Sequence, residues 1–292
     1  MSGSKKSEGE QLVALDAELP DVAGTPCITQ GVYGERGNLE LVAPDAKDGL
    51  WVFWYNGDAK DFQLGARRGC WSGGLRFAQG FRYNGAAIVQ SRHGPHWLEV
   101  VATSDDRAQR FTWRPESGFT RTDDSWRAIG SPAATETNEG VLLIATVASR
   151  DLIEVRSSDG VVKTVATDRV ARGVVLSETG ELIWGDEIGV HTETGTVVGA
   201  RWPAAVSGGH IAWIEDRSVK LSEGPALECS VLPDDLSLAA SHIDADRLEL
   251  ILRCGASLWH ARFDVANEIW GSLDLVTSRI WARSRTSEVH RL

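Results

Sequence analysis

The chain has 292 residues, a formal net charge of -11 at pH 7, 30 Gly, and 12 Trp against one Met. This abundance of Gly and aromatic residues, with few long helix-forming runs, favours an all-β fold. The negative charge argues against nucleic-acid binding, which depends on Lys and Arg. Because no apolar run reaches membrane-spanning length, we expect no membrane partner either.

Residues 1–10 read MSGSKKSEGE, and no apolar segment follows their two lysines. We interpret them as a disordered leader without a secretory signal, and residues 11–292 as a single β-propeller domain. The four cysteines are far apart and form no CxxC or Cys/His ligand pattern (Cys27, Cys70, Cys229 and Cys254). We therefore predict a cytoplasmic protein with reduced thiols, without a disulfide framework, metal site or cofactor.

An internal repeat begins at residue 24. The segment 24–54 resembles 85–113, and a third copy follows at 248–271; the matched positions are Ile28 and Ile88, Gln30 and Gln90, Leu39-Glu40 and Leu98-Glu99, and Trp54 and Trp113, with Leu248-Glu249-Leu250 in the third copy. Each copy holds about four short alternating strands separated by turn residues, a pattern typical of β-propeller blades. We predict blades at 24–80, 82–128, 131–168, 169–202, 203–232 and 236–271.

The two ends of the chain decide the expected number of blades. The segment 11–19 reads as one strand, and 273–289 supplies about three more. A blade built from both termini would close the ring and pair the exposed strand edges. We therefore predict seven four-stranded blades closed by the N- and C-terminal strands. Six blades is the alternative if the C-terminal strands pack differently.

The repeated motifs resemble those of bacterial seven-bladed propeller lectins of the Photorhabdus lectin type and of the related tectonin-like proteins. The motifs are Leu39 to Val42, Leu50 to Trp54 and Trp71 to Gly73, with their counterparts around Leu98, Trp113 and Trp126, and around Leu248, Leu258 and Trp270. The resemblance covers blades one, two and six, about half of the chain. It implies a soluble protein that recognises a carbohydrate or another small polar ligand, although the divergence of the other blades argues against a full set of equal sites.

The recurring Trp and Glu residues have structural interpretations. Large aromatic side chains are what closely packed propeller sheets require, so we expect each recurring Trp to lie in the core. Glu40, Glu99 and Glu249 occupy separate blades around a ring. Catalysis by paired carboxylates needs both at one site, so we expect these three to be structural or solvated.

The loops between the first and second strands of the blades carry much of the histidine, whereas the loops between the second and third strands are acidic. We predict a ligand site at the mouth of the axial channel on the histidine side, formed by Gln30, Gln90, Arg92, His93, His96, His210 and His242.

Three functions remain open at this stage. The first is lectin-like binding of a small polar ligand by a monomer. The alternative is a β-propeller enzyme, a lyase, hydrolase or cyclase acting on a small molecule at a single His-rich site. No GxSxG, HExxH or phosphate-loop motif occurs, so no catalytic residue is assigned. The third is a protein-interaction platform whose acidic face meets a basic partner.

Overall fold

The computed structural model describes residues 20–57, 62–63, 66–241, 243 and 246–277. Within these ranges every regular element is a β-strand, so the described chain offers no helix of the length and apolarity that crossing a membrane requires. The all-β prediction is confirmed.

The strands of the first three blades form antiparallel four-stranded sheets in chain order from the axis outward. Blade one contains β1 (Cys27–Gly31), β2 (Asn38–Pro44), β3 (Leu50–Tyr55) and β6 (Leu75–Phe77), with a small hairpin of β4 (Phe62–Gln63) and β5 (Ala66–Arg67) inserted; blade two contains β7 (Gly85–Gln90), β8 (Leu98–Ser104), β9 (Arg107–Arg114) and β10 (Gly118–Arg127); blade three contains β11 (Ile129–Glu136), β12 (Leu142–Ser149), β13 (Leu152–Ser157) and β14 (Gly160–Ala166).

The last three blades repeat this arrangement. Blade four contains β15 (Gly173–Leu176), β16 (Leu182–Gly185), β17 (Val190–Thr192) and β18 (Gly195–Val197); blade five contains β19 (Ala204–Ser207), β20 (His210–Glu215), β21 (Ser218–Leu221) and β22 (Leu227–Glu228); blade six contains β23 (Asp235–Ser241), β24 (Arg247–Cys254), β25 (Ser257–Asp264) and β26 (Ile269–Trp270), and β27 (Asp274–Leu275) also pairs with β25. The six predicted blade ranges agree with these sheets to within about two residues, since β11 begins at Ile129 and β23 at Asp235.

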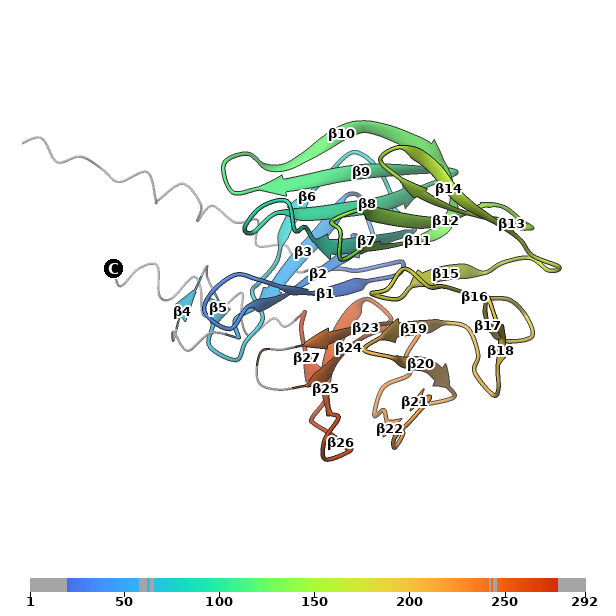
Figure 1. The fold of residues 1–292 in the computed structure, drawn as a ribbon. Helices are drawn as coiled ribbons and strands as arrows, with labels where there is room; N and C mark the ends of the chain where they lie inside the picture. Colours follow the sequence, from blue (N-terminus) through green and yellow to red (C-terminus); the bar gives the residue numbers. More distant parts are fainter. Residues whose placement is uncertain (1–19, 58–61, 64–65, 242, 244–245, 278–292) are drawn as a thin grey trace, which may run out of the picture.

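The first strand of each blade lies at the centre of the ring. β1, β7, β11, β15, β19 and β23 contact one another in this order, and β23 contacts β1 (Figure 1). At the closing point the backbone N–H of Ile28 donates to Ser237 Oγ at 3.0 Å, and the Thr25 hydroxyl donates to Asp235 Oδ2 at 2.6 Å. Blades one and six are therefore direct neighbours.

This direct contact contradicts the seven-bladed prediction and confirms the six-bladed alternative for the part of the chain that the structure describes. The seventh blade was to be built from both termini, but the described start of the C-terminal segment, β27, pairs with β25 of blade six. The predicted strand at 11–19 and residues 278–289 lie outside the described residues.

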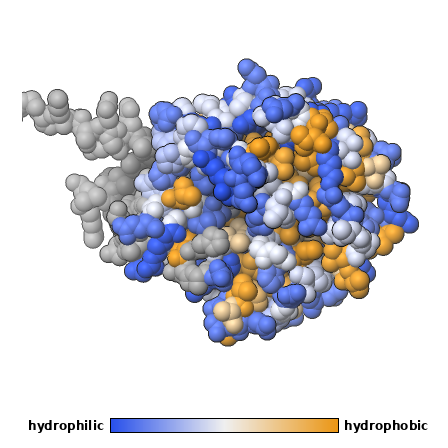
Figure 2. Space-filling view, in the orientation of Figure 1, coloured by the Kyte–Doolittle hydropathy of each residue, from blue (hydrophilic) through white to orange (hydrophobic). Residues whose placement is uncertain are grey.

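The hydrophobic core is divided among the six junctions between neighbouring blades. In β2, Leu39, Leu41 and Ala43 pack against blade six, whereas Val42 packs against blade two. Successive side chains of a strand point to opposite faces, so one alternating strand serves two junctions. The resulting surface mixes hydrophilic residues with small groups of hydrophobic ones on the face that Figure 2 shows.

The recurring Trp residues lie in or beside these junction cores. Trp51 and Trp71 are buried, and the others expected there are half-buried (Trp54, Trp113, Trp126 and Trp259). The Trp51 indole N–H donates to Asp45 Oδ2 at 2.6 Å, because a large amphipathic ring in a core needs a partner for its N–H.

The acidic loops between second and third strands use several of their carboxylates locally. Asp45 accepts from the backbone N–H groups of Lys47 at 2.8 Å and Asp48 at 3.0 Å. In blade four, Asp186 likewise accepts from Ile188 at 2.7 Å and Gly189 at 3.1 Å. These Asp side chains stabilise the turns, which is a common role of Asp in loops.

Candidate ligand-binding site

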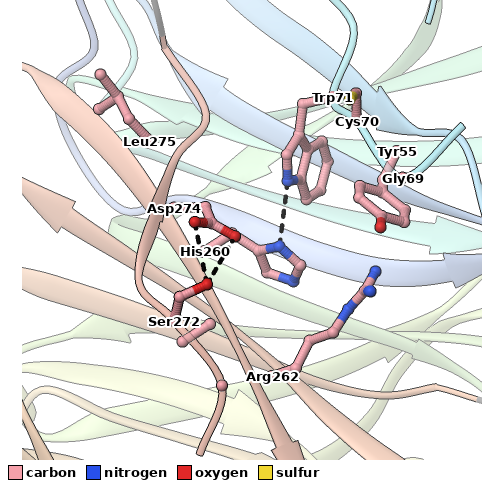
Figure 3. A pocket seen from close by; sticks show the side chains of 11 residues that line it. Tyr55, Gly69, Cys70, Trp71, His260, Arg262, Ser272, Asp274 and Leu275 are labelled. Atoms are coloured by element: carbon pink, nitrogen blue, oxygen red, sulfur yellow. Dashed lines mark hydrogen bonds between the residues drawn. The ribbon is translucent and has the colours of Figure 1, made fainter. Parts of the chain in front are cut away.

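A cavity of about 340 Å³ lies between blade six and blade one (Figure 3). Blade one contributes the end of β3 and the loop before β6, and blade six contributes β25 and the segment after β26. The lining residues are Tyr55, Gly69, Cys70, Trp71, His260, Ala261, Arg262, Gly271, Ser272, Asp274 and Leu275. The volume is at the lower end of the range for small-molecule sites.

The strand register of blade six directs three polar side chains towards this junction. Glu249 of β24 pairs with Arg262 of β25, and Ile251 pairs with His260. Ile251 packs in the core shared with blade one. Side chains at alternate positions share a face, so Glu249, His260 and Arg262 point towards blade one as well.

A hydrogen-bonded chain links the two blades. The Trp71 indole N–H donates to His260 Nδ1 at 3.2 Å, and His260 Nε2 lies 2.7 Å from Glu249 Oε2. The indole nitrogen is only a donor, so His260 Nδ1 has to be the acceptor. The imidazole therefore carries its proton on Nε2 and donates it to Glu249.

Arg262 supplies the positive charge of the cavity. Its Nε donates to Glu249 Oε2 at 3.0 Å, and its guanidinium carbon lies 4.3 Å from the centroid of the Tyr55 ring. Its Nη2 is buried and makes no hydrogen bond to any residue that the structure describes. A buried donor without a partner is costly, and an acceptor on a ligand would satisfy it.

Both partners of this ion pair are charged at neutral pH. Burial raises the pKa of Glu249, but the hydrogen bond from His260, the charge of this imidazole once it is protonated, and the charge and hydrogen bond of Arg262 outweigh it, and the net pKa lies below the ordinary value. Burial lowers the pKa of Arg262, but the Glu249 charge outweighs it and the net pKa is raised. Opposite charges in close contact favour the ionised form of each other.

The rest of the lining combines two aromatic rings with a polar rim. The rings of Tyr55 and Trp71, here called the aromatic wall, meet edge to face with centroids 5.6 Å apart. Across the cavity, the Ser272 hydroxyl lies 3.1 Å from Asp274 Oδ1 (Figure 3). Aromatic surface beside a guanidinium and a carboxylate suits a ligand with an apolar face and several hydroxyl groups.

The equivalent Glu residues of blades one and two stand in different surroundings. Glu99 is buried and accepts from Arg110 at 3.0 Å and Arg114 at 3.1 Å, which satisfies both of its oxygens. Glu40 pairs across the ladder with Trp54 instead of an arginine, and Asn38 Nδ2 donates to it at 2.5 Å. All three Glu have structural partners, as predicted, but only Glu249 stands behind a cavity lined by the residues that bind it.

The predicted site residues Gln30 and Gln90 hold loops together. Gln30 Nε2 donates to the carbonyls of Gly31 at 2.7 Å and Asn38 at 3.1 Å. Gln90 Nε2 donates to those of Ser91 at 3.1 Å and Trp97 at 2.9 Å. The repeated Gln therefore closes the same loop, between first and second strands, in two blades.

Arg92 and His93 connect blade two to blade three. The Arg92 backbone N–H donates to Glu136 Oε2 at 2.9 Å, and His93 Nε2 is 2.8 Å from the Gly140 carbonyl oxygen. His96 has a φ of 60° and contacts Tyr33 of blade one, with ring centroids 4.7 Å apart and the ring planes tilted by 59°. The structure thus brings Gln30, Gln90, Arg92, His93 and His96 to neighbouring strand ends and loops of blades one and two, where Arg92 and His93 contact blade three.

The other two predicted residues are not joined to that group. His210 opens β20 of blade five, on the opposite side of the ring from blade two. His242 lies outside the described residues. No contact within the described ranges links His210 to the five others, and no cluster of three or more His, Cys, Asp or Glu is arranged there to hold a metal ion.

The sequence analysis did not identify His260, Arg262 or Asp274. The repeat gives a partial signal for the first two, because blade one has Val52 and Trp54 at the positions where blade six has His260 and Arg262. Blade two has Arg110 and Thr112 there and uses Arg110 to pair with Glu99, so a polar residue at these positions indicates a partner of the repeated Glu and does not by itself indicate a site.

The sequence matches no protein-family model and no curated protein. Solved structures share its fold. A mutant Aleuria aurantia lectin in complex with Fucα1-6GlcNAc has 11% identity and a TM-score of 0.61, covering 89% of this chain and 98% of that one. SapL1 lectin in complex with α-methyl fucoside has 13% identity, the same coverages and a TM-score of 0.56.

A third structure, BBS1N in complex with ARL6DN, has 10% identity and a TM-score of 0.53, covering 89% of this chain and 83% of that one. Identities this low show the fold alone. The resemblance to propeller lectins noted in the sequence is therefore confirmed as a shared β-propeller fold, in six blades instead of seven.

Proposed function

We propose that this chain binds a neutral carbohydrate in the cavity between blades six and one. The observation that carries the proposal is the combination, in one cavity, of the aromatic wall with the buried Nη2 of Arg262 and the carboxylate of Asp274. A sugar ring offers an apolar face for the wall and hydroxyl groups that both accept from Arg262 and donate to Asp274.

The charges favour a neutral sugar over an acidic one. Arg262 is already balanced by Glu249 at 3.0 Å, and Asp274 adds a further negative charge at the rim. A carboxylate or sulfate on the ligand would be repelled by this net negative lining, whereas a hydroxyl group is not.

The fold comparison supports the same ligand class. Two structures with this fold are lectins in complex with fucosides, so α-methyl fucoside is the first probe. The channel-mouth site predicted from the sequence stays a prediction, as does the enzyme alternative.

The test is calorimetric titration with α-methyl fucoside, preceded by a glycan array that includes acidic sugars. We expect Arg262→Lys and Asp274→Asn each to weaken binding by about tenfold or more, because each removes a directed hydrogen bond. Arg156→Lys is the matched control, since Arg156 is also paired with a glutamate, Glu154 at 2.7 Å, but lies in blade three.

Two results would contradict the proposal. One is the absence of binding to every neutral glycan. The other is binding that Arg262→Lys and Asp274→Asn leave unchanged but the double variant His93→Ala with His210→Ala abolishes, which would place the ligand at the channel mouth.

A further inference from the structure

We infer that His260 is a positioning residue that holds Trp71 in the aromatic wall while it is neutral and releases it when it gains a proton. The inference rests on the proposed function, because it concerns how that binding cavity is kept in shape. Its central observation is independent of any ligand: Trp71, His260 and Glu249 form one hydrogen-bonded chain across the junction.

The direction of these two hydrogen bonds makes the contact between Trp71 and His260 sensitive to protonation of the imidazole. His260 can accept from the Trp71 indole only while Nδ1 carries no proton, and Glu249 holds the single imidazole proton on Nε2. A second proton would go to Nδ1. Two N–H donors would then face each other across 3.2 Å, and the hydrogen bond to Trp71 would be replaced by repulsion.

The charged and titratable groups around His260 come from each neighbouring element. β24 provides Glu249, β25 provides Arg262, and blade one provides Tyr55 and Cys70; Asp274 lies on β27. The negative charge of Glu249 favours protonation, and the positive charge of Arg262 opposes it. Protonation would strengthen the contact of His260 Nε2 with Glu249 Oε2, which are 2.7 Å apart, but Nδ1 would still be unable to accept from the Trp71 N–H.

The backbone beside Trp71 is fixed independently of His260. The backbone N–H of Asn56 donates to the Cys70 carbonyl at 3.0 Å, and that of Ser72 donates to the Trp54 carbonyl at 2.8 Å. The loss of the indole hydrogen bond therefore changes the orientation of the side chain and leaves the loop in place. Trp71 is 6% exposed, so its ring cannot turn without altering the cavity lining.

Replacing His260 by asparagine separates positioning from protonation. In His260→Asn, the amide oxygen takes about the position of Nδ1 and accepts from Trp71, but it has no pKa in the working range. In His260→Ala, the acceptor is lost at every pH. The matched control is His191→Asn in blade four, because His191 is also paired with a carboxylate, Asp186 at 3.0 Å, and stacked on a tryptophan, Trp184.

The first measurement uses the ligand-free full chain. The indole N–H resonance of Trp71, identified by its absence in Trp71→Phe, is followed by NMR from about pH 8 to about pH 4, the range in which histidines protonate. We expect it to titrate in the parent chain and in His191→Asn, and to stay constant in His260→Asn. Circular dichroism at each pH checks that the chain remains folded.

The second measurement is the affinity for α-methyl fucoside over the same pH range. We expect about a tenfold loss towards acid pH in the parent chain and in His191→Asn. His260→Asn should lose this pH dependence, and His260→Ala should bind weakly at every pH.

The inference is overturned if the Trp71 resonance does not titrate in the folded parent chain. It is also overturned if His260→Asn loses affinity for α-methyl fucoside towards acid pH as much as the parent chain does. If Trp71 titrates but no pH allows fucoside binding, the positioning role stands and the proposed ligand fails. Should His260→Asn not fold, the titration of the parent chain alone decides.

Discussion

The substitution of glutamate by glutamine at two equivalent positions tests the electrostatic reasoning most directly. Glu40 and Glu249 occupy the same place on the second strands of blades one and six, and Gln preserves the shape of each side chain. We expect Glu249→Gln to destabilise the fold and Glu40→Gln to stabilise it at pH 7, because only Glu249 has a cationic partner.

Glu249→Gln destabilises the fold because it leaves the charge of Arg262 uncompensated. Its side chain is 1% exposed and accepts from Arg262, whose side chain is 25% exposed. Breaking a buried ion pair by removing one partner costs 3–5 kcal/mol, and the partial exposure of Arg262 suggests about 3 kcal/mol. The pKa of Glu249 is lowered in the fold, so its contribution is present above the ordinary pKa and is lost as the pH falls through the folded value.

Glu40→Gln should change the stability in the opposite direction. Burial raises the pKa of its carboxyl from 4.5 to about 8, against the opposing effect of the Asn38 hydrogen bond. The folded chain must therefore hold Glu40 protonated at pH 7, which costs about 3 kcal/mol relative to the unfolded chain. Glu40→Gln removes this cost at pH 7 and has little effect near pH 4, where the carboxyl is protonated in both states.

The assay is urea unfolding followed by Trp fluorescence at pH 7 and pH 4, with the slope of each transition compared to confirm that the unfolded states match. Stability changes of the same sign in the two variants at pH 7 would refute the reasoning. So would an effect of Glu40→Gln that is equal at both pH values.

Three further predictions concern stability. Trp54→Ala and Trp113→Ala should each lower the free energy of unfolding in urea by about 3 kcal/mol. This value is at the lower end for large aromatic residues because both side chains are half-buried, and a loss below about 1 kcal/mol would contradict their packing at the junctions. Thr25→Val should lower the free energy of unfolding by about 1–3 kcal/mol, because it removes the hydroxyl that donates to the half-buried Asp235. Thr25→Ser, which keeps the hydroxyl, should be nearly neutral. Gln90→Leu should speed amide exchange in residues 91–97, and also at Val32, whose N–H donates to Gln90 Oε1 at 3.3 Å, while that of 33–37 stays constant. Uniform exchange would count against its loop-closing role.

The sequence was sufficient to predict the blades because blade structure is local. Alternating strands and turn residues recur within each segment, and the match of Gln30 with Gln90 marked equivalent first strands before their shared role in closing a loop was known. The number of blades is not local. It depends on the contact between β1 and β23, which joins Ile28 to Ser237 across a sequence separation of 209, and no strand pattern shows whether two inner strands meet.

The candidate site was missed for a related reason. Trp71 and His260 are separated by 189 positions, and the sequence gives no sign that they face each other until the ring is known to close between blades one and six. Two of the predicted histidines, His93 and His96, are close in sequence, yet His93 and the Arg92 backbone are engaged in contacts with blade three.

The three repeated Glu show how one fold position acquires different roles. Each lies on the second strand and faces the next blade, so the backbone offers the same opportunity three times. Beside Glu40 stands Trp54, and the junction is filled with aromatic rings. Beside Glu99 stand two arginines that satisfy it completely. Beside Glu249 stand His260 and Arg262, which leave a donor and a cavity facing blade one. The same two positions hold Val52 and Trp54 in blade one and Arg110 and Thr112 in blade two, so the side chains opposite the repeated Glu set the chemistry of each junction.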